Sequence, residues 1–183
     1  MMFKKKILVD QSIYTTTIPK VLPINFDKLN INILENYYYK NKLNSNQFSY
    51  LKDYYSLEFD KQIRWLSDFI VDHYGMLYKK KVIPLAQAGI VVEKNQSINS
   101  HHHIDDYDLD NSPDISAIIV CKTGNEKSYV EFEYEHGRKR HHKHLVELKP
   151  KKVVVFNSEL RHSFLTNINH EPILCISLKF QLI

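Results

Sequence analysis

The second half of the chain is divided into short strand-like segments separated by turns, and this spacing constrains the fold most. Between residues 85 and 182 the segments are rich in β-branched and aromatic residues, and several alternate apolar with polar side chains. Short strands at near-regular intervals predict an antiparallel sandwich or jelly roll. The predicted strands are Leu85–Val92, Ile98–Asp105, Ile115–Lys122, Tyr129–Glu135, His144–Leu148, Val153–Phe156, Ser163–Asn167 and Ile173–Leu182.

The first half of the chain reads differently and predicts a cover for this core. From Phe59 to Tyr78 apolar residues recur three and four positions apart, which predicts an amphipathic helix. Before it, Lys6–Val9 suggests a first strand, residues 36–47 suit a loop or short helix, and the Pro19–Pro23 segment resists regular structure. We expect one domain over residues 1–183, with residues 1–80 as a strand and helical cover and residues 81–183 as the jelly-roll core.

Composition excludes several classes of protein. The chain has 183 residues, 43% of them hydrophobic, which suits a globular fold with a sizeable core. Cys121 and Cys175 lie in apolar runs and are expected to be buried, reduced thiols. Because no apolar run approaches the roughly 18 residues of a membrane span, and the basic start is followed by too short an apolar run for a signal peptide, we expect a cytoplasmic protein.

Two histidine-containing segments carry the candidate chemistry. In an extended strand alternate side chains share a face, so His103 and Asp105 are expected to project together. His162 lies 59 residues further on, after a strand-like run, and can supply a third ligand from a neighbouring strand. Two imidazoles and one carboxylate form the facial triad of non-haem Fe(II) oxygenases, which leaves three coordination positions open. An idle or adventitious histidine-rich surface turn is the alternative to such a site.

The arrangement of these motifs resembles that of the Fe(II)/2-oxoglutarate-dependent dioxygenases, in particular the small bacterial and phage-type members. The resemblance covers about residues 59–183 and depends on His103-x-Asp105, on His162 and on the closing strand from Ile173. It implies a double-stranded β-helix, a mainly β (α+β) jelly roll with the N-terminal helices packed on one sheet. It further implies Fe(II), 2-oxoglutarate as cosubstrate, O2, and hydroxylation of a small-molecule or peptidyl substrate.

One departure from the family concerns the cation that pairs with the distal carboxylate of 2-oxoglutarate. Where the family usually has an arginine at the start of the final strand, this chain has Ile173. Lys179, 17 residues after His162, is the first substitute, and Lys122 is the second. Either lysine could also be an ordinary strand-edge residue. If neither lysine binds the carboxylate, the prediction that the protein uses 2-oxoglutarate is lost, whereas the prediction of a metal site is unaffected.

The extra histidine His101 leaves other metal sites open. His101, His103 and His162 together would resemble the three-histidine site of cupins, with Asp108 as a possible fourth ligand. The glycines of the cupin motifs are missing, which favours the dioxygenase interpretation. Structural zinc is a further option, because imidazole and carboxylate also suit Zn²⁺. A jelly-roll binding module without catalytic activity is the last alternative.

A dense basic segment, residues 136–144, separates two predicted strands. Such a cluster can bind phosphate or nucleic acid, although like-charge runs are more often solvated loops. The net charge of +4 permits an anionic partner without requiring one. We therefore expect an exposed hairpin loop and do not favour nucleic-acid binding.

Overall fold

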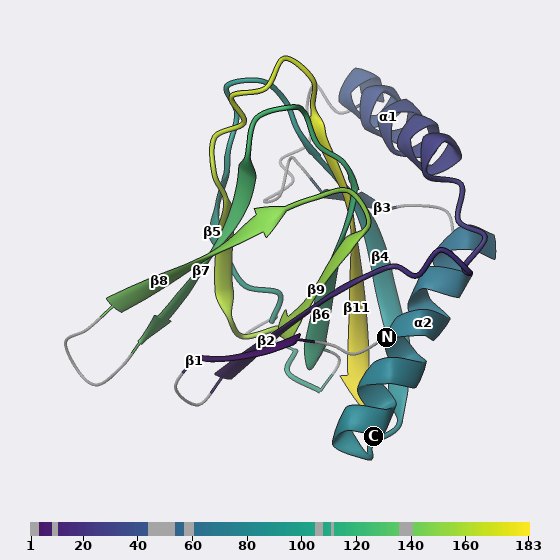
Figure 1. The fold of residues 1–183 in the computed structure, drawn as a ribbon, viewed down its shortest axis with the longest axis vertical. Helices are drawn as coiled ribbons and strands as arrows, with labels where there is room; N and C mark the ends of the chain where they lie inside the picture. The colour runs from purple at the N-terminus through teal and green to yellow at the C-terminus, as the bar shows by residue number, and fades with distance from the viewer. Residues whose placement is uncertain are drawn as a thin grey trace.

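The computed structural model describes residues 4–8, 11–43, 54–56, 61–104, 108–110, 112–135 and 141–183, and these form two facing antiparallel sheets with helices on one side (Figure 1). The larger sheet has the strand order β1-β2-β9-β6-β11-β4-β3, and the smaller sheet has the order β5-β10-β7-β8. This is the predicted jelly roll. The larger sheet contains β1 (Lys4–Leu8), β2 (Gln11–Thr17), β3 (Tyr54–Ser56), β4 (Val82–Val92), β6 (Ile115–Lys122), β9 (Lys152–Asn157) and β11 (Ile173–Leu182). The smaller sheet contains β5 (Ile98–His101), β7 (Ser128–Glu135), β8 (His141–Leu148) and β10 (Arg161–Phe164).

The larger sheet separates two hydrophobic cores, because alternate residues of its strands face opposite sides. On β11, Leu174, Ile176 and Leu178 belong to the core shared with the helices, whereas Ile173 and Cys175 belong to the core between the sheets. Strands buried on both faces explain the near-continuous apolar runs of the sequence. Full burial of each such side chain contributes roughly 1.5–3 kcal/mol to stability.

The helices α1 (Phe26–Leu43) and α2 (Lys61–Tyr78) cover the outer face of the larger sheet (Figure 1). Ile63, Leu66 and Ile70 of α2 are fully buried against it, as the three- and four-residue spacing predicts. Helix α1 is longer than the loop or short helix expected around residues 36–47. The N-terminal strands also do more than cover the core, because β1, β2 and β3 extend the larger sheet itself.

Two predicted strand boundaries near the histidines are wrong. Strand β5 ends at His101, so His103 follows the strand instead of lying in it. Strand β10 begins at Arg161, because His162 pairs with Phe132 of β7 on one side and with His101 of β5 on the other. These boundaries are set by pairing with strands that are distant in sequence. The local pattern of apolar and polar residues carries no information about that pairing.

The prediction of an exposed hairpin loop over residues 136–144 is also partly wrong. Strand β8 begins at His141, so the second half of the basic segment is a strand and not a loop. Pairing with the acidic strand β7 explains the difference. Nζ of Lys143 lies 2.7 Å from Oε1 of Glu131 and 3.9 Å from Oε1 of Glu133. Residues 136–140 lie outside the described residues.

The expectation for the two cysteines is confirmed. Cys121 and Cys175 are free and buried, and burial raises the pKa of both thiols. Neither described helix combines the length and apolarity that crossing a membrane requires.

Candidate metal centre

Three imidazoles meet at one end of the space between the sheets. His101, at the end of β5, His103, just beyond it, and His162, on β10, each offer a ring nitrogen, and these nitrogens all lie within 4.8 Å of one another. The ring centroid of His162 is 4.3 Å from that of His101 and 4.8 Å from that of His103. Antiparallel pairing of His101 with His162 brings two of the three together, because directly opposite residues project from the same face.

Each imidazole is held in place through Nδ1. Nδ1 of His101 lies 2.8 Å from the carbonyl oxygen of Asn99, and Nδ1 of His162 lies 3.1 Å from that of Leu160. Nδ1 of His103 lies 2.7 Å from Oγ of Ser116. Metal-binding histidines characteristically use one ring nitrogen for such a contact and present the other to the ion. The cluster therefore has the form of a metal site that presents three Nε2 atoms.

The surroundings keep these rings neutral. Burial lowers the pKa of His101, lowers that of His103 well below its usual range, and lowers that of His162 to about 3. Phe132 and Phe156 pack against His162, with ring centroids 5.8 and 4.8 Å from it. Only neutral imidazole can bind a metal ion. Nε2 of His162 is buried and has no hydrogen-bond partner among the described residues, which fits an atom that serves as a ligand.

A buried serine pair supports His103 and was missed by sequence reasoning. Oγ of Ser116, on β6, lies 2.7 Å from Oγ of Ser158, and the backbone N–H of His103 donates to the carbonyl oxygen of Ser158 at 2.9 Å. Both serines are fully buried. Serine in a strand or turn is too common to attract notice, so nothing in the sequence signals that role.

Lys179 lies beside the cluster. It pairs with Ser116 across β11 and β6, so its side chain shares the face of the serine that contacts His103. Its charge acts on all three histidines by lowering their pKa values. Burial lowers the pKa of Lys179 itself, and no carboxylate pairs with it within the part of the chain that the structure describes.

Ser177 adds a second polar group on the same face of β11. It lies two residues before Lys179 and is fully buried, and its hydroxyl has no hydrogen-bond partner among the described residues. A register shift between β11 and β4 follows Lys179, where Ala86 faces Lys179 and Pro84 faces Phe180. Bulges of this kind often re-aim side chains next to functional sites. The ammonium of Lys179 and the hydroxyl of Ser177 therefore share one face of β11.

The remaining sequence-predicted residues lie elsewhere or outside the description. Lys122 is at the far end of β6 and forms an ion pair with Glu171, with 3.0 Å between Nζ and Oε2. Asp105 lies outside the described residues, so its place relative to the cluster remains a prediction. Asp108 is exposed and is not one of the three clustered residues.

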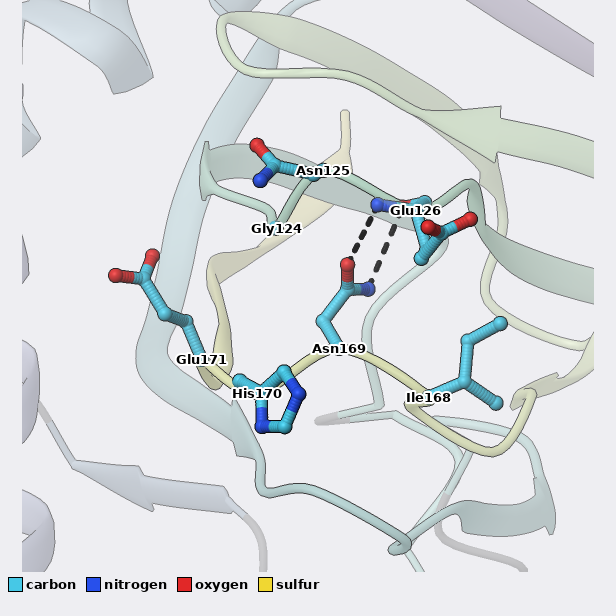
Figure 2. A pocket seen from close by; sticks show the side chains of 7 residues that line it. All are labelled: Gly124, Asn125, Glu126, Ile168, Asn169, His170 and Glu171. Carbon is cyan, nitrogen blue, oxygen red and sulfur yellow. Dashed lines mark hydrogen bonds between the residues drawn. The ribbon is translucent and has the colours of Figure 1, made fainter.

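A cavity of about 460 Å³ lies at the opposite end of the molecule, where the loops after β6 and β10 meet. Figure 2 shows the side chain of Asn169, on the loop after β10, directed toward the loop after β6, where its amide is bonded to the backbone of Glu126. None of the three clustered histidines lines this cavity. Its wall is a structural junction, because a side chain on Gly124 would overlap the amide of Asn169.

Comparison with solved structures supports the fold. The chain matches the non-haem α-ketoglutarate-dependent carbocyclase SnoK from nogalamycin biosynthesis with a TM-score of 0.65 and 12% identity, covering 93% of this chain and 79% of that one. It matches a Pseudomonas putida prolyl-4-hydroxylase with a TM-score of 0.57 and 12% identity, covering 94% and 93% of the two chains. It matches the epimerase SnoN, solved with Fe³⁺, α-ketoglutarate and nogalamycin RO, with a TM-score of 0.54 and 13% identity, covering 91% and 78%. Scans against protein-family models and curated proteins found no match. The shared property is the double-stranded β-helix fold.

Proposed function

We propose that this protein is a non-haem Fe(II)- and 2-oxoglutarate-dependent oxygenase. The observation that carries the proposal is the convergence of three neutral imidazoles, two buried and one half-buried, at one end of a double-stranded β-helix. Imidazole suits iron among several transition metals. The fold is shared with solved 2-oxoglutarate-dependent enzymes, which selects iron and 2-oxoglutarate from the possible metals and cosubstrates.

His103 and His162 are the two ligands that every version of the site includes. Asp105 is the carboxylate that the dioxygenase pattern supplies, and His101 is the imidazole that the structure brings into the cluster. The position of His101 favours it as a third protein ligand. A cupin-like binding protein is not favoured, because the matched structures that are described above are 2-oxoglutarate-dependent enzymes or a prolyl hydroxylase.

Lys179 and Ser177 are proposed to bind the distal carboxylate of 2-oxoglutarate. The half-buried ammonium of Lys179 has no carboxylate partner among the residues that the structure describes, so an incoming anion would stabilise it. Charge-assisted hydrogen bonds are about twice as strong as neutral ones. The Ser177 hydroxyl can donate a second hydrogen bond from the same face. Lys122 is the less suitable anchor, because Glu171 already neutralises it.

When bound, iron with 2-oxoglutarate and O2 supplies an oxidant that can attack a C–H bond, with succinate and CO2 as coproducts. The protein contributes the orientation of the ligands and the exclusion of water. Phe132 and Phe156 line the cluster with apolar surface, which limits solvent access. Hydroxylation of a small molecule or a peptidyl side chain is the proposed reaction.

The test is the metal-dependent conversion of 2-oxoglutarate to succinate. Purified protein with Fe(II), ascorbate and 2-oxoglutarate should release succinate in air, and the His162→Ala variant should release none above background. Anaerobic titration with Fe(II) and 2-oxoglutarate should produce a weak visible charge-transfer band in the wild type. Tight metal binding with neither the band nor succinate would contradict 2-oxoglutarate use while leaving the metal site in place.

The third ligand is decided by a matched pair of variants. If His101 binds the ion, His101→Ala should weaken Co(II) binding far more than Asp105→Ala does, and the Co(II) absorption spectrum should change only in the former. The opposite ranking would assign the position to Asp105 and give the two-histidine, one-carboxylate triad.

A further inference from the structure

At the histidine end, two successive residue pairs on the inner face of β7 and β8 consist entirely of flat rings. On β7, Phe132 belongs to the core between the sheets, and Tyr134, two residues further on, packs against that core. On β8, His144 pairs with Phe132 and His142 pairs with Tyr134. Directly opposite residues of an antiparallel pair project from the same face. These four side chains therefore form one continuous surface, which we call the ring wall.

The ring wall adjoins the metal cluster. On the side away from β8, Phe132 pairs with His162 of β10, so His162, Phe132 and His144 form one row across three strands. The rings of Phe132 and His162 are close to parallel, with 29° between their planes and 5.8 Å between their centroids. Tyr134 lies roughly 7 Å from Phe132, because a strand rises about 3.4 Å per residue. A molecule that lies on the wall is therefore next to the cluster.

The outer part of the ring wall is accessible. Strand β10 begins at Arg161, which pairs with Glu133, so among the described strands only β8 pairs with β7 beyond that point. Figure 1 shows this end of β7 and β8 projecting beyond the rest of the smaller sheet. Whereas Phe132 is fully buried, Tyr134, His142 and His144 are half-buried. Part of their ring surface is therefore left for a ligand to cover.

We propose that the ring wall binds a small-molecule substrate through a flat, conjugated ring that stacks on Tyr134 and His142 and so places the substrate beside the metal cluster. The inference rests on the proposed function and names the substrate class that this function leaves open. Tyr134 and His142 already stack on each other, with 22° between the ring planes and 5.4 Å between the centroids.

The chemistry of the wall favours a flat ring over a saturated one. Aromatic pairs in offset-stacked or edge-to-face geometry gain about 0.5–1.5 kcal/mol beyond the burial of apolar area. A saturated ring gains only the burial of area. It also covers polar imidazole and phenol groups without making the directional contacts that a π system makes with them.

A peptide is a less suitable occupant of the ring wall. Extended peptides commonly bind by adding a strand to an exposed sheet edge, where backbone groups are available. The ring wall is instead the face of a sheet, and at Phe132 the strand β7 has β10 on one side and β8 on the other. The wall therefore offers side-chain rings and not a backbone edge.

Two probes with the same carbon skeleton test the inference, namely 2-naphthol and its saturated counterpart decahydro-2-naphthol. Titration of the full chain, with and without Zn(II), is followed in ¹H–¹⁵N amide spectra, which give the Kd and the location of each probe. We expect 2-naphthol to bind about 5–10-fold more tightly and to shift the amide signals of Tyr134, His142 and His144. Equal affinities, no binding, or shifts confined to other residues would overturn the inference. Tighter binding of the peptide Gly-Trp-Gly than of 2-naphthol would overturn the assignment to a small molecule.

Variants of two tyrosines on β7 provide the second arm. Tyr134→Leu should bring the Kd for 2-naphthol close to that for decahydro-2-naphthol, and Tyr134→Phe, which keeps the ring, should bind as the wild type does. Tyr129→Leu is the matched control, because Tyr129 pairs with Glu147 and lies on the opposite face of the same strand. Unchanged binding of 2-naphthol in Tyr134→Leu would contradict the role of the wall.

The succinate assay keeps this inference separate from the proposed function. Succinate release without any preference for the flat probe would overturn the inference alone. Preference for the flat probe without succinate release would overturn the proposed function and leave the ring wall as a binding surface.

Discussion

The two ends of the jelly roll both bury polar side chains, but the hydrogen bonds of these side chains are satisfied differently. At the asparagine end, the amide of Asn169 accepts from the backbone N–H of Glu126 and donates to Glu126, Ser128 and Asn167. At the histidine end, Nε2 of His162 is buried without a hydrogen-bond partner among the described residues. The ends are separated by the length of β6, whose seven residues from Ser116 to Lys122 span roughly 20 Å.

This difference is the one expected between a structural junction and the proposed metal site. Buried polar groups are nearly always hydrogen-bonded, and an unmet one costs about 1–3 kcal/mol. At the asparagine end, the buried polar groups form their hydrogen bonds with other groups of the protein. The side chain of Asn167 also donates to the carbonyl oxygens of Val92 and Glu171, so these bonds hold neighbouring loops together. The histidine end leaves a lone pair available, which an ion can use. Burial of polar groups alone would not have distinguished the two ends.

The largest expected effect is at the histidine end. His162→Leu removes one ligand atom and leaves an apolar side chain of similar size among Phe132 and Phe156. Co(II) affinity should fall by more than about 100-fold, above the usual effect of an outer partner. The free energy of unfolding of the metal-free protein should change by no more than about 1 kcal/mol, because an unmet polar atom is removed at the same time. Titration and chemical denaturation measure the two quantities.

The converse is expected at the asparagine end. Gly124→Ala places a methyl group on the amide of Asn169, which must move and release its bonds to Glu126. We expect a loss of about 1–3 kcal/mol in unfolding free energy, the usual cost of overpacking. Co(II) affinity should remain that of the wild type. A comparable loss of metal affinity would show that the two ends are coupled through β6 and would break the comparison.

The next largest effect concerns the proposed role of Lys179 in binding 2-oxoglutarate at the histidine end. Lys179→Met keeps the length of the side chain and removes its charge, so the KM for 2-oxoglutarate should rise about 10–100-fold, as expected for a hydrogen bond to a charged group. Fe(II) affinity in the absence of 2-oxoglutarate should not fall. Lys122→Met is the matched control for the cosubstrate, because Lys122 lies at the other end of β6. An increased KM in Lys122→Met alone would assign the anchor to Lys122.

The smallest expected effect is the change in thermal stability caused by Lys122→Met. Lys122 and Glu171 form a partly exposed pair with side-chain exposures of 38% and 58%. Exposed ion pairs contribute about 0–1 kcal/mol, so thermal unfolding should shift only slightly. A loss as large as that of Gly124→Ala would mean that the pair, and not the asparagine network, holds this end together.

Much of the fold was predictable because it depends on local patterns. The three- and four-residue spacing from Phe59 onward predicted α2, and the period-two and apolar runs predicted most strands of the two sheets. The N-terminal strands β2 and β3 were missed, because Gln11–Thr17 is stable as a strand only through pairing with β9 and Tyr54–Ser56 only through pairing with β4. The residues of a short strand do not indicate which distant strand it will pair with.

The amino-acid sequence alone indicated the kind of chemistry: His103 with Asp105 in one segment and the distant His162 in another predict a metal site, with His101 as the alternative ligand. Apolar strands indicate the sheets that bury it. Only the tertiary structure decided which imidazoles meet and what orients them. The pairing of His162 with His101, and the contact of His103 with Ser116, depend on the registers of strands that are far apart in sequence. Register shifts by one residue reverse the face of every side chain, so the site is a property of strand pairing that no single segment contains.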